Sequence, residues 1–179
     1  MLSTAEVRTG TVIDAAITEF AKTGYLGTPT ASVAARAKIS TAYVFKLFPS
    51  KEKLFVAALD RCFERVVAAL EVGADAAASQ SPADVLDAMG EAYADLIADR
   101  NLLMLQVHAQ SAADVPEIGD ALRRGLGAVT EFAKSRSRAA DAEVQRFIAF
   151  GQLCHLIVTT GIDDSSSDWA TLLTAGIRH

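Results

Sequence analysis

A short stretch near residue 50 contains two helix starts and one helix stop, and it constrains the fold more than any other part of the chain. Ser40 is a typical N-cap for a helix over Thr41–Phe48, and Pro49 cannot continue that helix. Ser50 then caps a longer helix over residues 51–71. The shorter helix carries three aromatic and two aliphatic side chains, more than eight residues can bury. We therefore expect it to pack one face on the preceding residues and to leave another bare.

The preceding residues carry two further helical patterns. The first has apolar residues at the spacing of one helical face: Ile13, Ala16, Ile17 and Phe20. Gly24 is a typical residue past the end of such a helix. Thr28 and Pro29 predict an N-cap and a first-turn proline for a brief second helix, and Lys38-Ile39 predicts the turn after it. Three short helices, the last two separated by a tight turn, predict a helix-turn-helix unit.

The third predicted helix has an apolar side and a mixed side. At about 100° per residue, Val44 and Phe48 point one way, flanked by Leu47 and Phe45. The remaining arc carries one small residue, one cation and one phenol, with a threonine at the N-terminal tip: Ala42, Lys46, Tyr43 and Thr41. This surface suits the major groove of DNA. The alternative interpretation is a solvated face on a small helical bundle.

The charge distribution is compatible with DNA binding but does not decide it. The net charge is −5, yet residues 1–60 carry seven basic and five acidic residues against ten and seventeen in the rest. An excess of two basic residues over residues 1–60 is small enough to arise by chance. Lys51 is more informative, because the first turn of a helix favours acids, and a cation there makes sense if a phosphate approaches.

The stretch from Val12 to Leu59 resembles the DNA-binding head of the TetR-like family of bacterial transcription regulators. The resemblance rests on IDAAITEFAKTGYLGT, on the alanine-rich second helix and on ISTAYVFKLFPSKEKLF. It implies an all-α fold of about nine helices. It also implies a helix-turn-helix DNA-binding domain over residues 1–50 and a ligand-binding and dimerisation domain over 51–179, connected by the helix over 51–71.

The resemblance implies a function as well as a fold. It implies a repressor that binds a near-palindromic operator as a homodimer and is released by a small apolar effector. Carried over residue by residue, the implied DNA-binding residues are Thr28, Thr30, Ser40, Thr41, Ala42, Tyr43, Phe45, Lys46 and Lys51. Phe45 and Leu47 stand where the family often has phosphate-binding Tyr and His, so two donors are missing and the Tyr43 hydroxyl is the candidate replacement. Lys38 replaces a turn glycine, at about 1 kcal/mol if it is left-handed.

The C-terminal third predicts a dimer interface. The helix expected over Asp141–Gly161 is apolar nearly all round and must be covered on both sides. One side can pack on its own body, while the other needs the shorter helix expected over Asp168–Ile177 and a partner chain. Gly151 either permits close backbone approach or is a tolerated defect. The resemblance implies a four-helix dimer bundle, and the candidate interface residues are Phe147, Gly151, Cys154, Val158, Trp169, Leu172 and Leu173.

The candidate effector-binding residues have adaptable or dual-character side chains: Met89, Tyr93, Met104 and His108. Plain core packing is the alternative interpretation for each of them. Cys62 and Cys154 match no metal or redox spacing, and we expect two buried thiols in a reducing compartment. No metal site and no cofactor are expected.

Several other classes of protein are disfavoured. The sequence has no Gly-rich phosphate loop, no HExxH and no nucleophile elbow, so we do not expect an enzyme. It shows no signal-peptide pattern, and its most apolar stretch, Phe147 to Ile162, is too short for a membrane span. A cytoplasmic location is therefore expected. Two alternatives to the DNA-binding regulator stay open: a helical ligand-binding or oligomerisation module without DNA function, and a small all-α enzyme.

Overall fold

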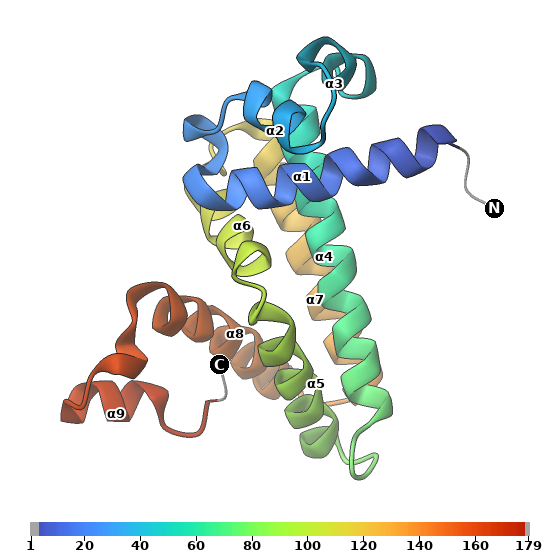
Figure 1. Ribbon diagram of the computed structural model, residues 1–179. Helices are drawn as coiled ribbons and strands as arrows, with labels where there is room; N and C mark the ends of the chain where they lie inside the picture. The colour runs from blue at the N-terminus through green and yellow to red at the C-terminus, as the bar shows by residue number, and fades with distance from the viewer. Residues whose placement is uncertain (1–3, 178–179) are drawn as a thin grey trace. The chain divides into compact units, whose positions relative to one another are not determined.

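The computed structural model describes the backbone of residues 4–177 and the side chains of residues 6–177, and it is helical throughout (Figure 1). Residues 1–3 and 178–179, which the proposed domains include, lie outside the described residues. The described helices are α1 (Thr4–Gly27), α2 (Thr30–Arg36), α3 (Thr41–Leu47), α4 (Lys51–Asp75), α5 (Pro82–Ile97), α6 (Arg100–Ser111), α7 (Pro116–Ser137), α8 (Asp141–Thr160), the 3₁₀ turn η1 (Ile162–Asp164) and α9 (Asp168–Thr174). The predicted all-α class with about nine helices is confirmed. None of these helices is long and apolar enough to cross a membrane.

The chain divides into two compact units, which are described separately. The head unit comprises Met1–Glu64 and Arg100–Leu126, and the tail unit comprises Arg65–Asp99 and Gly127–His179. Helices α4 and α7 are therefore each divided, with the first half in the head unit and the second half in the tail unit. The proposed domain boundary at residue 50 stays a prediction.

Aromatic rings form the centre of the head unit. The Phe20 and Phe55 rings meet edge to face with centroids 4.8 Å apart, and Tyr25 packs on Phe55 at 5.6 Å. Of the predicted stripe of α1, Ala16, Ile17 and Phe20 are buried and Ile13 is half-buried. The helix was expected to end before Gly24, but it continues to Gly27 beyond a kink at Gly24, where φ is 70°. A side chain at Gly24 would meet the His108 ring of α6 at 3.0 Å, so this close approach requires glycine.

The helix-turn-helix turn forms at the predicted place. Lys38 has a φ of 55°, the left-handed conformation that the missing glycine would favour. The Ala37 N–H donates to the Val33 carbonyl at 2.9 Å and the Ile39 N–H to the Ala34 carbonyl at 3.0 Å, which closes the end of α2. The start of α2 differs from the prediction. Pro29 is the N-cap residue, in place of Thr28.

The tail unit depends on close helix packing. α5 begins with a side-chain cap, in which the Ser81 hydroxyl accepts a hydrogen bond from the Asp84 N–H at 3.2 Å. A Cβ at Gly73 of α4 would lie 2.5 Å from the Ala88 carbonyl oxygen of α5, so glycine permits the approach of these helices. α5 also packs on α8. η1, α8 and α9 share a small hydrophobic cluster. Its buried residues are Ile157, Ile162 and Ala170, and the partly buried Leu153, Leu173 and Ile177 pack against them.

Candidate nucleic-acid interface

Helix α3 is buried on one side and bare on the other. Val44 and Phe48 are buried, as the helical periodicity predicted. Five residues form the outward face of α3: Thr41, Ala42, Tyr43, Phe45 and Lys46, with Ala42, Phe45 and Lys46 exposed and the other two half-buried. Phe45 differs from expectation, because it was expected to flank the packed side and is instead 45% exposed.

The N-terminus of α3 is fixed by a side-chain cap. The Tyr43 N–H donates to the Ser40 hydroxyl at 3.2 Å, while the Ser40 backbone is extended. The N-cap role predicted for Ser40 is therefore confirmed. The cap satisfies a backbone donor in the first turn of the helix, which contains the half-buried Thr41 and the exposed Ala42. The C-terminus lies within one residue of the expected end, because α3 stops at Leu47.

Two side chains of the outward face lie against each other. The Lys46 ammonium is 6.0 Å from the centroid of the Tyr43 ring, at the outer limit of a cation–π contact. Such a contact at an exposed site contributes well under about 1 kcal/mol. The contact therefore adds little stability, but it places a cation and a phenol on the same side of the outward face.

Lys51 is anchored at the start of α4. Its ammonium donates to the Leu26 carbonyl at 3.4 Å and lies 5.0 Å from the centroid of the Tyr25 ring. Partial burial lowers the pKa of Lys51, and the nearby Glu52 carboxylate opposes that shift. Lys51 therefore reaches from α4 to the end of α1 and keeps its charge at the surface of the head unit.

A tyrosine–carboxylate contact joins α1 and α4 beside Lys51. The Tyr25 hydroxyl donates a hydrogen bond to Glu52. Burial, followed by this bond, raises the pKa of Tyr25 to about 12. The same bond is the main cause of the lowered pKa of Glu52. No pattern in the sequence joins this pair, although an acid in the first turn of a helix was a signal that could have drawn attention to Glu52.

Thr28 has a structural place that the sequence did not predict. Its side chain is 1% exposed, and its hydroxyl donates to the Glu19 carbonyl at 3.2 Å and lies 2.8 Å from the Thr23 hydroxyl. The predicted capping role is wrong, because the Thr28 hydroxyl turns back onto α1. A buried, engaged hydroxyl is also unsuited to a phosphate contact, so Thr28 leaves the candidate DNA-binding set. Thr30, at the first position of α2, is partly exposed and stays in it.

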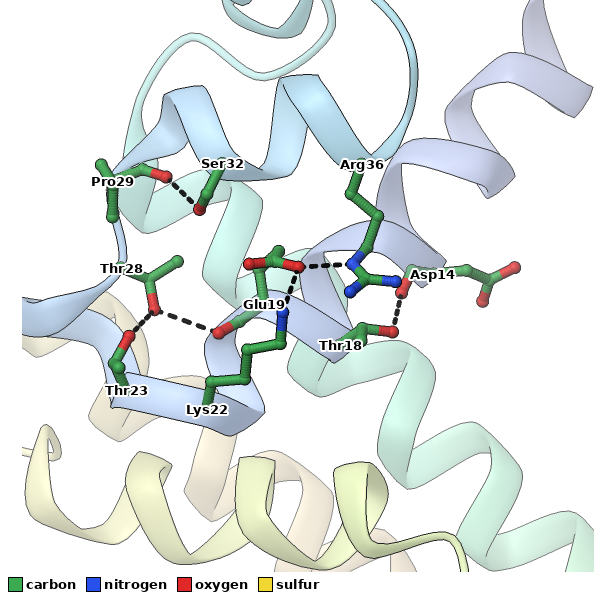
Figure 2. Close-up of polar contacts among 9 residues, drawn as sticks. All are labelled: Asp14, Thr18, Glu19, Lys22, Thr23, Thr28, Pro29, Ser32 and Arg36. Carbon is green, nitrogen blue, oxygen red and sulfur yellow. Dashed lines mark hydrogen bonds and ion pairs between the residues drawn. The ribbon is translucent and has the colours of Figure 1, made fainter.

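Figure 2 shows that α1 and α2 are tied by one carboxylate. Glu19 of α1 pairs with Lys22 at 2.8 Å and with the Arg36 guanidinium of α2. The Lys22 hydrogen bond is the largest cause of the lowered pKa of Glu19. Nearby, the Ser32 hydroxyl donates to the Pro29 carbonyl at 2.8 Å in the first turn of α2. These contacts fix α2, on which α3 packs.

The four candidate effector-binding residues fall into two pairs. Met104 and His108 share one face of α6 in the head unit, whereas Met89 and Tyr93 share one face of α5 in the tail unit. Met89 is fully buried and Met104 is half-buried. The Nε2 atom of His108 is buried, with no hydrogen-bond partner among the described residues. The structure thus groups each pair on its own helix.

The tail unit contains a tyrosine–histidine pair that the sequence analysis did not find. The Tyr93 hydroxyl and the Nε2 atom of His155 are 2.5 Å apart, and His155 is 4% exposed. Burial lowers the pKa of His155 to about 4, so the ring is neutral near pH 7. Its Nδ1 atom is buried without a hydrogen-bond partner among the described residues. The two residues are 62 positions apart in sequence, and no local pattern joins them.

The candidate dimer-interface residues differ in how far the chain itself covers them. Cys154 is buried within the tail unit, and Phe147 and Gly151 lie against α5, near Gly90 and Tyr93 respectively. This side of α8 therefore packs inside its own chain. Val158 is half-buried, and Leu173 packs in the small cluster at the chain end. The large apolar side chains that α8 and α9 expose are Phe150, Leu156, Trp169 and Leu172, so only Trp169 and Leu172 of the predicted set belong to the exposed surface.

A surface hollow of about 490 Å³ lies along α7 and α8 of the tail unit. Lys134 and Asp141 pair at 2.6 Å in its wall, and the Lys134 hydrogen bond lowers the pKa of Asp141. The hollow is lined by Thr130, Lys134, Asp141, Val144, Gln145, Ile148 and Ala149. It contains none of the four candidate effector-binding residues. No cluster of three metal-ligating side chains occurs among the described residues.

The packed three-helix head with a bare third helix defines a helix-turn-helix protein. Residues 12–58 match the profile of the bacterial regulatory proteins of the tetR family, so this segment is a head of the TetR type. The match covers the segment from which the sequence analysis drew the resemblance, which is thereby confirmed. No curated protein matches the chain in sequence.

Solved structures extend the similarity to the whole fold. A transcriptional regulator of Pseudomonas aeruginosa PAO1 has a TM-score of 0.70 and 19% identity, over 97% of this chain and 89% of that one. A TetR-like regulator of Rhodococcus sp. RHA1 has a TM-score of 0.68 and 22% identity, over 97% and 94%. The regulator FadR of Bacillus subtilis, in complex with stearoyl-CoA, has a TM-score of 0.70 and 15% identity, over 93% and 94%. The chain therefore has the fold of a TetR-family transcriptional regulator.

Proposed function

We propose that this chain is a homodimeric regulator of transcription that binds a near-palindromic operator and is released by a small effector. The observation that carries the proposal is the outward face of α3, which is bare while Val44 and Phe48 pack the opposite side. The Ser40 cap and the Glu19–Arg36 pair hold this helix and its neighbour in place. A rigid short helix with one free face is the geometry that enters a major groove. Such a protein works where the chromosome is, which for a bacterial regulator is the cytoplasm.

The proposed DNA contacts follow from exposure and chemistry. Thr41 and Ala42 at the tip of α3 face the base edges, and Lys46 and Lys51 approach phosphates. Lys51 lies in the first turn of α4, where the helix dipole adds to the attraction for an anion. The Thr30 hydroxyl is a further phosphate donor. Ser40 acts as a positioning residue, because its hydroxyl accepts the cap hydrogen bond.

The proposed dimer uses the apolar surface that α8 and α9 leave exposed. Phe150, Leu156, Trp169 and Leu172 are each between 47% and 76% exposed. Large apolar side chains grouped on neighbouring helices mark a protein–protein interface. A two-fold dimer presents two copies of α3, which bind half-sites about 34 Å apart on one side of the duplex.

The proposed effector is a small molecule with an apolar part. The similar FadR structure contains stearoyl-CoA, which supports a ligand with a long apolar chain in this fold. In the tail unit, Met89 offers adaptable apolar surface and the Tyr93–His155 pair offers a polar group beside it. Met104 and His108 are the corresponding candidates in the head unit. Tyr93→Phe and His108→Phe, measured separately, show which helix carries the effector response.

The decisive test is selection of DNA from a random double-stranded pool by the purified protein. The proposal expects an enriched inverted repeat whose half-sites are about 10 base pairs apart, bound by two chains. A helical ligand-binding module without DNA function would enrich no sequence. Recovery of no repeat after repeated rounds at low salt would contradict the proposal.

A pair of lysine variants tests the assigned docking on the selected operator. Lys51→Ala should weaken binding to all sequences alike and lower the slope of log K against log salt by about one unit per subunit. Lys53→Ala is the matched control, because it removes the same charge from an exposed position two residues away. Equal salt slopes for the two variants would show that Lys51 has no privileged phosphate contact.

A further inference from the structure

The outward face of α3 has an apolar half and a polar half. At about 100° per residue, Phe45 and Ala42 lie next to each other on one side of the exposed arc, and Lys46 and Tyr43 follow on the other. Both apolar residues are exposed, Phe45 by 45%. The Lys46 ammonium lies 6.0 Å from the Tyr43 ring centroid, so the two polar side chains are neighbours. Thr41 lies beside Phe45 and adds a methyl group to the apolar half.

The apolar half does not serve the core of the head unit. Val44, with 0% exposure, and Phe48, with 9%, already fill the packed side of α3. Ala42 and Phe45 carry no hydrogen-bonding side-chain group, so these two side chains cannot read the donors and acceptors of a base pair. An exposed phenylalanine on a face that also carries Lys46 needs an apolar partner.

We propose that Phe45 and Ala42, with the methyl group of Thr41, read the 5-methyl groups of thymine in the operator. This inference rests on the proposed DNA-binding function and names the chemistry by which α3 selects its sequence. The thymine methyl is the apolar feature of the major-groove edge, and alanine, phenylalanine and threonine methyl groups are its usual partners. Two apolar side chains next to a lysine are too small a surface for a stable protein partner, which needs roughly 1,000 Å².

The size of the effect follows from the area of one methyl group. Burying one such group contributes about 0.8 kcal/mol, which corresponds to about a fourfold change in Kd. A two-fold dimer makes the contact twice, once in each half-site. Removal of both contacted methyl groups should therefore weaken binding about 16-fold.

The test replaces thymidine by deoxyuridine in the operator selected by the wild-type protein. Each symmetric pair of thymidines is exchanged in turn, which removes the methyl group and leaves base pairing intact. Fluorescence anisotropy at constant salt then gives the ratio of Kd values for the deoxyuridine and thymidine duplexes. We expect at least one pair of positions with a ratio of about 16. Phe45→Ala should lower the ratio at those positions, because it removes the largest of the three apolar partners while the exposed site leaves the fold intact.

Lys46→Ala is the matched control on the polar half of the same helix. It should weaken binding to both duplexes by the same factor and keep their ratio. The proposal is overturned if every deoxyuridine duplex binds as tightly as the thymidine duplex, or if Phe45→Ala weakens both duplexes equally, as a contact with the sugar–phosphate wall would do. A protein that selects no DNA sequence contradicts the proposed function itself, whereas equal binding to the two duplexes contradicts this inference alone.

Discussion

Helices α3 and α8 both expose aromatic side chains, but α3 is positioned by local contacts and α8 by contacts with residues far away in the sequence. α3 has seven residues, a side-chain cap at Ser40 and one buried side centred on Val44. α8 has twenty residues, and its buried side includes Cys154 and His155, which pack within the tail unit. α3 is positioned by signals within a few residues of its ends. α8 is positioned by contacts with residues such as Tyr93, which lies 62 positions from its partner.

This difference bears on how each helix can carry function. A short helix with local caps presents its free side chains in one orientation, which suits the reading of a rigid DNA groove. A long helix with a buried polar pair can respond to a ligand or to protonation, because a change at that pair alters its packing. We therefore expect changes in α3 to affect recognition and changes in α8 to affect assembly and stability.

The largest effect on stability is expected from substitution of Phe55, a buried ring in the core of the head unit, to which α3 also belongs. Phe55→Ala should lower the free energy of unfolding by about 3–5 kcal/mol, because it leaves a cavity between Phe20 and Tyr25. Phe45→Ala is the matched control, and at an exposed position it should change stability by less than about 0.5 kcal/mol. Urea unfolding measures both. Similar losses would show that Phe45 belongs to the core.

The outer side of α8 is tested by a charge. Leu156→Glu places a carboxylate on the surface proposed for the dimer, where burial of an unpaired charge costs about 3 kcal/mol or more. We expect monomers that keep their helical circular dichroism and lose operator binding. Light scattering at micromolar concentration makes the measurement. A wild-type protein that is itself monomeric there would remove α8 from any role in assembly.

The inner side of α8 is tested by pH. The folded pKa of His155, about 4, lies below its ordinary value of 6.5, so between these values the unfolded chain binds more protons than the folded one. This contribution is fully present above pH 6.5 and is lost as the pH falls toward 4. At pH 5 the loss should be about 2 kcal/mol relative to pH 7.5.

The variant His155→Gln isolates this dependence, because it cannot titrate and can still hydrogen-bond to Tyr93. Urea midpoints at the two pH values, compared between wild type and variant, give the contribution of His155. If wild type and variant lost the same stability on acidification, the pKa of His155 in the folded protein would not be lowered by burial.

The smallest effect is expected on the polar half of the α3 outward face. We predict that the Tyr43 hydroxyl donates to a phosphate, in place of the donors that Phe45 and Leu47 lack. Tyr43→Phe should then weaken operator binding by about 1 kcal/mol. Anisotropy titrations at constant salt make the comparison. Wild-type affinity in Tyr43→Phe would leave Tyr43 as mere cover for the edge of the helix packing.

The sequence predicted α3 well because its signals are local. Ser40, Pro49 and the apolar spacing of Val44 and Phe48 set its bounds within one residue and its buried side correctly. The left-handed turn at Lys38 was also predictable from the position at which glycine is usual. Thr28 was misplaced because Thr-Pro is a typical cap, whereas the folded chain uses its hydroxyl to join α1.

The tail unit was harder to predict for a physical reason. A helix that is apolar nearly all round has no polar face to show which side meets its own chain and which side meets a partner. Of the residues assigned to the interface, Phe147 and Gly151 lie near α5 and Cys154 is buried within the tail unit. The Tyr93–His155 pair was equally inaccessible, because only the packing of α5 on α8 brings the two side chains together.

The most direct test of the central claim is the affinity of the selected operator for Ala42→Glu. Ala42 is exposed near the middle of the outward face of α3, so the substitution leaves the core untouched and sets a carboxylate against the DNA. The control Ala83→Glu adds the same charge at an exposed position in the first turn of α5. We predict unchanged thermal stability for both variants, with loss of sequence-specific binding in Ala42→Glu alone. Equal operator affinity of the two variants would contradict the account that α3 reads the DNA.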